Sequence, residues 1–250
     1  MPDLPVALVN YSNEHLRRRG EARARALPRR LALPASALAG ARVLEIGCGF
    51  GETTHALRAL YGCDVLGVDP SPRFLKRPWS DLSIYREIDI CGLAAPGQEQ
   101  FDFIHSYTVW EHIEEPKRAI IAAFELLKPG GRAYFNYNLH LGASASHLLG
   151  HLNMPWIHLT HSEDQIMSLM RDKYGIGRGP SWTNKLSPLH YKQYFKEAGF
   201  DLLQHWYNRF PMSEDFYARH YDRLKGLPRE ELDLNFMHVR LERPLNGRNG

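Results

Sequence analysis

Three glycines alternate between an apolar run and the start of an expected helix. In the stretch RVLEIGCGFGETTHAL, residues 42–57, they are Gly47, Gly49 and Gly51. A strand-to-helix turn without side chains lets a ligand approach the backbone, and in an open parallel sheet this turn borders the ligand site. A dinucleotide fingerprint needs its last glycine where this chain has Glu52, and no Gly-Lys-Ser or Gly-Lys-Thr of a phosphate loop follows. The spacing therefore disfavours a pyrophosphate ligand.

Two carboxylates follow at the ends of the next two predicted strands. Asp69 comes eighteen residues after Gly51, where a carboxylate can accept both hydroxyls of a ribose. Asp89 ends the third predicted strand, where it can accept an adenine amino group while Ile90 flanks the ring. Each carboxylate alone is a common turn residue. Together with the glycine turn they predict a site for an adenosine-like ligand.

Histidines supply the candidate catalytic groups, because an imidazole can accept a proton near neutral pH. His112 lies in VWEHIEE at the expected ligand edge of the sheet, and His140 follows the fifth predicted strand. Both are candidate general bases, with a packing role as an equal alternative for His112. His147 and His151 are spaced one helical turn apart and could share a metal ion. No H-E-x-x-H motif or acidic cluster accompanies them, so we expect no metal.

Aromatic side chains in the same region could form a wall against a sugar, an aromatic ring or a cationic group. Trp110, Tyr137 and Trp156 fit no helical stripe, so they are the candidate substrate-binding residues. Tyr191 and Phe195 have the spacing of a helix that packs on a sheet. The alternative for all of these aromatic residues is the core of a lid.

The composition fits one globular domain with a full core, since 44% of the 250 residues are hydrophobic and 24% are charged. No apolar run approaches the length of a membrane span, and the start lacks the apolar segment of a secretory signal, so we expect a cytoplasmic protein. Three cysteines without metal-knuckle spacing suit a reducing compartment. Seven arginines fall in the first thirty residues, and we interpret them as the solvated face of a helix. We expect no nucleic-acid partner. The oligomeric state, with a homodimer as one alternative, is left open.

Short apolar runs alternate with amphipathic stretches from residue 42 onward, which is the pattern of a parallel sheet covered by helices on both faces. We predict strands at 42–46, 64–68, 83–88, 101–106, 132–138, 201–207 and 236–242, and the main helices at 116–127, 143–152, 163–174, 188–198 and 214–224. About sixty residues separate the fifth and sixth strands, which predicts a lid or substrate-binding insertion. The expected organisation is an N-terminal helical segment (1–40), a cofactor-binding core (41–138), a helical lid (139–187) and the C-terminal part of the core (188–250).

Five segments in order resemble the successive motifs of the S-adenosylmethionine-dependent methyltransferases of the Rossmann-like class. They are VLEIGCGFGETT, VLGVDPS, EIDI, FDFIHSYTVWEHIEEP and LLKPGGRAYFNYN, and they lie within residues 40–138. The resemblance implies an α/β, three-layer Rossmann-like fold with a seven-stranded sheet whose last strand is antiparallel, and S-adenosyl-L-methionine as the cofactor. Two later segments, MPWIHLTHSEDQIM and WTNKLSPLHYKQYFKEAGF, resemble bacterial methyltransferases of glycan or secondary-metabolite pathways.

The resemblance also implies roles for individual residues. Glu45 and the three glycines would surround the methionine end of the cofactor, Asp69 with Pro70 would hold the ribose, Asp89 and Ile90 the adenine, and Ser106 and Tyr107 would line the wall near the sulfonium.

Methyl transfer from a sulfonium is an in-line displacement, so the implied enzyme must align its acceptor and exclude water. We expect a methyltransferase that acts on a small-molecule or glycan-precursor acceptor, with oxygen as the favoured atom. Carbon or nitrogen methylation of a metabolite is the nearest alternative. A non-catalytic cofactor-binding or scaffold protein is a further one, and a nicotinamide-dependent oxidoreductase would require the glycine spacing that this chain lacks.

Overall fold

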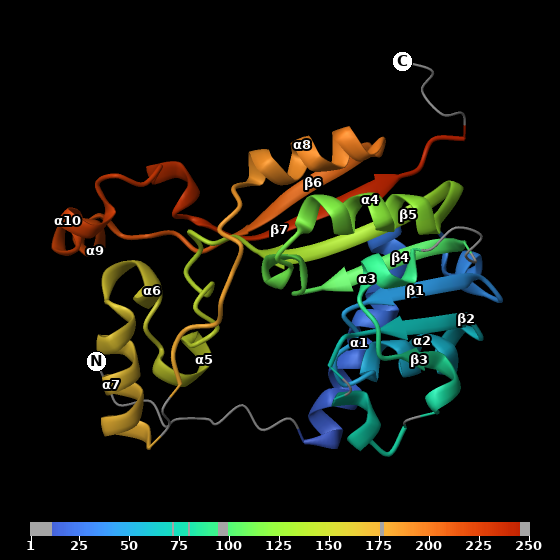
Figure 1. The fold of residues 1–250 in the computed structure, drawn as a ribbon, viewed down its shortest axis with the longest axis horizontal. Coiled ribbons are helices and arrows are strands. Elements are labelled where there is room, and N and C mark those ends of the chain that lie inside the picture. Colours follow the sequence, from blue (N-terminus) through green and yellow to red (C-terminus); the bar gives the residue numbers. More distant parts are fainter. Residues whose placement is uncertain (1–11, 72, 80, 95–99, 176–177, 246–250) are drawn as a thin grey trace.

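The computed structural model of the chain describes residues 12–71, 73–79, 81–94, 100–175 and 178–245. Within them, one seven-stranded sheet has the order β3-β2-β1-β4-β5-β7-β6 (Figure 1). Its strands are β1 (Arg42–Ile46), β2 (Asp64–Val68), β3 (Tyr85–Arg86), β4 (Phe101–Tyr107), β5 (Leu127–Asn138), β6 (Asp201–Arg209) and β7 (Leu234–Glu242). β7 pairs antiparallel with β5 and β6, whereas the pairs among β1 to β5 are parallel. The predicted α/β fold with an antiparallel last strand is confirmed.

Two strands differ by more than two residues from their predicted bounds, for local reasons. β3 is shorter than 83–88, because Asp81 caps a 3-10 turn at Leu82–Ile84 and Asp89 caps the following helix. β5 begins before residue 132, because Leu127 already pairs with Phe101 ahead of an irregularity in the ladder. The helix α4 (Pro116–Leu126) therefore ends one residue before its predicted end.

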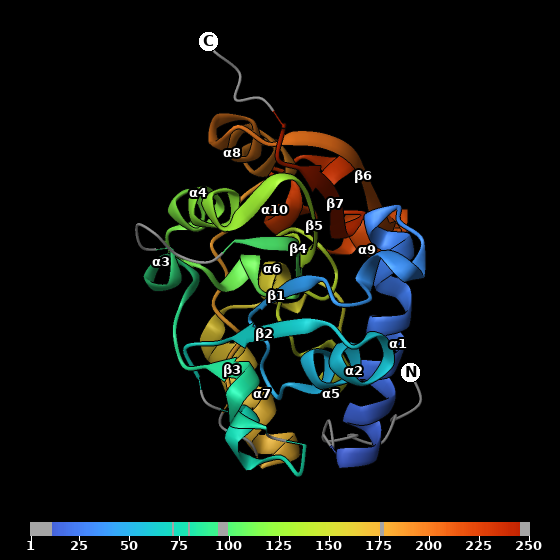
Figure 2. The same cartoon turned by 90° about the vertical axis from the view of Figure 1, so that its right-hand side faces the viewer.

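Helices cover both faces of the sheet, as Figure 2 shows. On one face lie α1 (Asn13–Leu31) and α2 (Glu52–Tyr61), and on the other lie α3 (Ile90–Leu93), α4 and α8 (Pro188–Ala198). Gly20 lets α1 come close to α2, because a Cβ at this position would lie 2.3 Å from the carbonyl oxygen of Glu52. The first turn of α2 is thus held against α1.

The expected insertion lies beyond the carboxyl ends of the parallel strands (Figure 1). It contains α5 (Leu149–Leu152), α6 (Ile157–Thr160) and α7 (Glu163–Tyr174), and it packs against a second excursion that carries α9 (Glu214–Arg219) and α10 (Tyr221–Leu224). The bounds of α7 and α8 are as predicted.

Two predicted helices are only partly formed. The helix expected at 143–152 is reduced to α5, because His147 has a positive φ of 55° that no right-handed helix accommodates. The helix expected at 214–224 is divided into α9 and α10 at His220, whose backbone is not helical.

None of the described helices combines the length and the apolar composition needed to cross a bilayer. The division of the chain at residues 40, 138 and 187 stays a prediction.

Candidate active site

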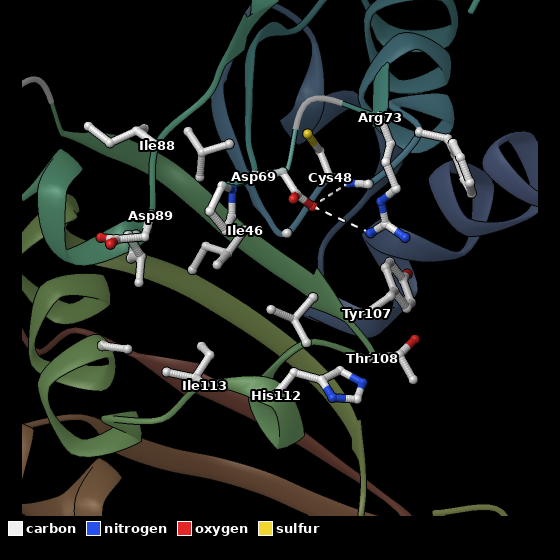
Figure 3. A pocket seen from close by; sticks show the side chains of 18 of the residues that line it. Ile46, Cys48, Asp69, Arg73, Ile88, Asp89, Tyr107, Thr108, His112 and Ile113 are labelled. Carbon is white, nitrogen blue, oxygen red and sulfur yellow. Dashed lines mark hydrogen bonds and ion pairs between the residues drawn. The ribbon is translucent and has the colours of Figure 1, made fainter. Parts of the chain in front are cut away.

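A cleft of about 990 Å³ opens at the carboxyl ends of β1, β2 and β4. It is bounded by the glycine turn after β1, the end of β2, the start of α3, the loop after β4 and part of the insertion. Asp69 and Arg73 lie on one side, and His112 and Ile113 lie across from them (Figure 3). This is the sheet edge at which the sequence predicted a ligand.

The three glycines of the turn serve two different purposes. All three have positive φ, and Gly47 and Gly49 line the cleft. A Cβ at Gly47 would lie 2.2 Å from Cγ2 of Val109, so only hydrogen fits between the turn and the loop after β4. A Cβ at Gly51 would instead meet the Tyr85 hydroxyl at 2.6 Å, and Gly51 does not line the cleft. Gly47 and Gly51 thus allow close packing, of the loop after β4 on the turn and of α2 on β3, whereas Gly49 keeps the turn open beside Arg73 at the cleft.

Asp69 ties the glycine turn to the end of β2. Its buried carboxylate accepts the Gly49 N–H on Oδ2 at 2.8 Å and the Ser71 N–H on Oδ1 at 2.8 Å, and Arg73 lies 3.9 Å from Oδ2. Each carboxylate oxygen can accept a second hydrogen bond, so both remain able to receive ribose hydroxyls. Asp69 and the neighbouring Pro70 line the cleft, as the sequence predicted.

Asp89 and Ile90 lie at the same cleft. Asp89 accepts the Gly92 N–H at 2.6 Å and so caps α3, while Ile88, Ile90 and Ile46 supply apolar surface. An adenine-sized ring would find apolar walls there and a carboxylate at its edge. The predicted adenine side of the site is assembled in one place.

Two of the predicted cofactor residues do not reach the cleft. Glu45 is buried, accepts a hydrogen bond from the Thr54 hydroxyl, and has its pKa raised by burial to about 8. Ser106 is fully buried in the sheet. Tyr107, the next residue, does line the cleft, and the guanidinium of Arg23 lies 4.6 Å from its ring centroid. Glu45 and Ser106 therefore lie behind the cleft wall, and their contact with a ligand stays a prediction.

The arginine-rich helix α1 contributes side chains to the lining of the cleft. The sequence did not predict this, because it favoured a solvated face for the helix. Arg19 and Arg23 line it, and both approach Oε1 of Glu52, with 2.8 Å from Arg19 Nε and 3.6 Å from Arg23 Nη1. Both arginines flank the buried stripe of α1 that begins at Leu16 and continues through Gly20. This position beside an apolar stripe is the signal that would have identified them.

A different group of side chains gathers across the cleft. Glu111 is 1% exposed and accepts the Asn138 N–H at 3.2 Å, and burial raises its pKa to about 8. His112 is exposed to the cleft, and its Nδ1 lies 2.8 Å from the Trp182 carbonyl oxygen. The ring of His147 lies beside it at a tilt of 48°, with ring centroids 4.7 Å apart, and burial lowers the pKa of His147 to about 4. The spacing in the sequence suggested a pair of His147 with His151, whereas in the structure His147 lies with Glu111 and His112.

Four predicted catalytic or substrate-binding residues lie outside the cleft lining. His140 is bound to the Thr183 hydroxyl at 2.9 Å and packs on His158, and burial lowers the pKa of His140 to about 4. The other three are buried aromatic residues that pack against other aromatic rings: Trp110 on Phe135, Tyr137 on Tyr191, and Trp156 on Phe210 and Phe216. The three rings lie in the core because strand pairing and the folded insertion turn each side chain inward, and the binding and catalytic roles of the four residues stay predictions.

Comparisons with known proteins agree with this architecture. The model of a methyltransferase domain family matches residues 15–205. The ubiquinone biosynthesis O-methyltransferase of Pseudomonas fluorescens (strain SBW25) is 36% identical over 105 residues, which are 40% of this chain and 45% of that protein. That of Stutzerimonas stutzeri (strain A1501) is 38% identical over 105 residues, with the same shares covered. The chain thus spans about half the length of the curated relatives it matches.

Solved structures show the same fold at low identity. A putative sarcosine dimethylglycine methyltransferase from Galdieria sulphuraria has a TM-score of 0.55 at 15% identity, covering 91% of this chain and 86% of that chain. An S-adenosylmethionine-dependent methyltransferase from Mesorhizobium loti has a TM-score of 0.54 at 20% identity, covering 88% of this chain and 98% of that one. The family match extends over most of the sequence and includes every strand from β1 to β5. The chain belongs to the methyltransferase domain family.

Proposed function

We propose that this chain transfers a methyl group from S-adenosylmethionine to a hydroxyl oxygen of a small-molecule acceptor. The observation that carries the proposal is the junction of the glycine turn with Asp69, where the Gly49 N–H meets a buried carboxylate at one edge of an open cleft. A Cβ at Gly47 would meet the Val109 side chain, so the turn at the cleft must be free of a side chain at this position. The cofactor supplies the activated methyl group when bound.

Cofactor binding is assigned to residues on both sides of the glycine turn. Gly47 and Gly49 would face the methionine portion, Asp69 would accept the ribose hydroxyls, and Asp89 with Ile90 would face the adenine. The ring of Tyr107 and the guanidinium of Arg23 close one wall. These contacts position the methyl group, which is most of what an in-line displacement requires.

The acceptor is assigned to the part of the cleft near His112 and His147. The curated relatives are named O-methyltransferases, and a hydroxyl nucleophile must lose its proton around the transition state. His112 is the predicted group for this step and lies at the cleft. Because those relatives are named for ubiquinone biosynthesis, hydroxylated aromatic rings are the first acceptors to test, ahead of the glycan precursors suggested by the insertion.

The test is methyl transfer by the purified full chain from methyl-labelled S-adenosylmethionine to a panel of catechols, phenols and matched aromatic amines. We expect one labelled methyl group on an oxygen, located by mass spectrometry and NMR. The variant His112→Ala should lose roughly 10²-fold or more in turnover while it keeps its affinity for S-adenosylhomocysteine. The variant His205→Ala, at an exposed position on β6, is the control and should retain turnover. Methylation of amines or carbon alone would contradict the oxygen assignment.

A further inference from the structure

We propose that Glu111, His112 and His147 form a binding site for one Zn²⁺ ion at the wall of the cleft. Each residue offers a ligand atom, and these atoms lie within 4.8 Å of one another. Nε2 of His147 is 3.8 Å from Oε1 of Glu111. A tetrahedral Zn²⁺ ion with bonds of about 2.0–2.2 Å keeps its ligand atoms about 3.3–3.6 Å apart, so small side-chain rotations would close the site.

Two of the offered groups have buried atoms that need a partner. Among the described residues, Oε2 of Glu111 and Nε2 of His147 have no hydrogen-bond partner. A buried polar atom left in this state costs about 1–3 kcal/mol. A cation between the carboxylate and the imidazole would give both atoms a partner. A purely structural role of Glu111 and His147 does not explain why these buried atoms lack one.

The surroundings already orient the candidate ligands. When Nδ1–H of His112 donates to the Trp182 carbonyl oxygen, at 2.8 Å, Nε2 carries the lone pair that a metal requires. Glu111 is held through the Asn138 N–H on its Oε1. Metal-binding histidines and carboxylates typically have such outer hydrogen bonds, which fix the ring tautomer and the side-chain direction.

The ligand types select the metal. Two imidazoles and one carboxylate form a set that Zn²⁺ accepts, whereas Mg²⁺ and Ca²⁺ prefer sites made of oxygen atoms. Three protein ligands leave a fourth position, and His112 and His147 both line the cleft. In a role that rests on the proposed function, the acceptor hydroxyl would take this fourth position. The ion would lower the pKa of that hydroxyl, so the hydroxyl proton would pass to solvent in the open cleft. In the zinc-bound chain, His112 would then be a metal ligand, and this role would replace the free-base role proposed above.

The first experiment titrates Zn²⁺ into the metal-stripped full chain in competition with a chromophoric chelator. We expect one ion per chain in the wild type and in His205→Ala. The double variant His112→Ala/His147→Ala should bind Zn²⁺ at least 100-fold more weakly, and Glu111→Gln at least 10-fold, because even the loss of an outer partner costs about 10–100-fold. No binding by the wild type, or equal affinity in the double variant, would overturn the site.

Co²⁺ absorption at saturating metal provides a second readout that does not depend on affinity. Visible bands of Co²⁺ bound to nitrogen and oxygen ligands should appear in the wild type. They should change in position and intensity in Glu111→Gln, whose carboxamide keeps the side-chain shape but removes the charged ligand, and unchanged bands would overturn the role of Glu111. Circular dichroism of every variant checks the fold. Binding of S-adenosylhomocysteine to the same samples separates the two proposals. A wild type that binds S-adenosylhomocysteine but no Zn²⁺ overturns the metal site alone, and a wild type that binds Zn²⁺ but no S-adenosylhomocysteine overturns the proposed function alone.

Discussion

Asp69 has two roles at the cleft, because it holds the glycine turn and also offers acceptor atoms to a ligand. Its carboxylate holds the Gly49 and Ser71 N–H groups, so the glycine turn is in place before any ligand arrives. A preorganised acceptor avoids the cost of ordering the turn during binding. The sequence predicted the ligand contact of Asp69 from its place at the end of a strand, and the structure adds its role in holding the turn.

Glu45 leads to a prediction on pH dependence. Burial raises its folded-state pKa to about 8 from an ordinary value of 4.5, so the folded chain binds this proton more tightly than the unfolded chain does. The proton on Glu45 therefore stabilises the fold fully at pH values below the unfolded-state pKa. This stabilisation declines as the pH rises through the folded-state pKa. Glu45→Gln keeps an acceptor for the Thr54 hydroxyl and removes the titration.

Urea unfolding at pH 5.5 and pH 7.5 measures this effect. The free energy of unfolding of Glu45→Gln, minus that of the wild type, should increase with pH by at most about 1.4 kcal/mol per unit. Because Glu111 titrates in the same range in both proteins, the difference isolates Glu45. A difference that stays constant with pH would contradict the assignment.

At the scale of elements, the glycine turn must stay clear of the loop after β4. In Gly47→Ala, the methyl group would meet Val109 at 2.2 Å and the residue would keep φ near +70°. Gly62→Ala is a matched control, since Gly62 has φ near +63° but nothing within 4 Å of its Cβ position. The control should lose about 1 kcal/mol of stability from the left-handed backbone alone.

Gly47→Ala should lose more stability than this control and should also lose affinity for S-adenosylhomocysteine. Thermal unfolding and calorimetry of the two variants provide the comparison. Equal losses of stability and of affinity in the two variants would mean that Val109 moves away from the added methyl group without a cost in free energy.

The insertion is held to the C-terminal excursion through Trp156. Its ring is buried against Phe210 and Phe216, and its indole N–H donates to the Leu232 carbonyl oxygen at 3.0 Å. Trp156→Ala should therefore destabilise the fold by about 3–5 kcal/mol, and Trp156→Phe should lose about 1 kcal/mol for the hydrogen bond. Urea unfolding measures both. A raised KM for the acceptor with unchanged stability would restore the substrate-binding role.

At the scale of the whole molecule, the cofactor side of the cleft was more predictable than the acceptor side. The glycine turn, Asp69 and Asp89 each follow a parallel strand, and the strand order brings such ends together at one edge. Glu111 and His147 meet only through the fold of the insertion, and no local periodicity records that contact. The burial of Trp110 could not be predicted for a related reason, since the turn after β4 directs its side chain back into the core.

The measurement that tests the account most directly is isothermal titration of the full chain with S-adenosylhomocysteine, with NADH as the parallel ligand. We predict one micromolar site for S-adenosylhomocysteine, no binding of NADH, and at least a 10-fold loss of affinity in Asp69→Asn, since hydrogen bonds to a charged group contribute about 1.5–3 kcal/mol. Asp64→Asn, at the exposed start of the same strand, should bind like the wild type. Absence of binding, a preference for NADH, or unchanged affinity in Asp69→Asn would contradict the account.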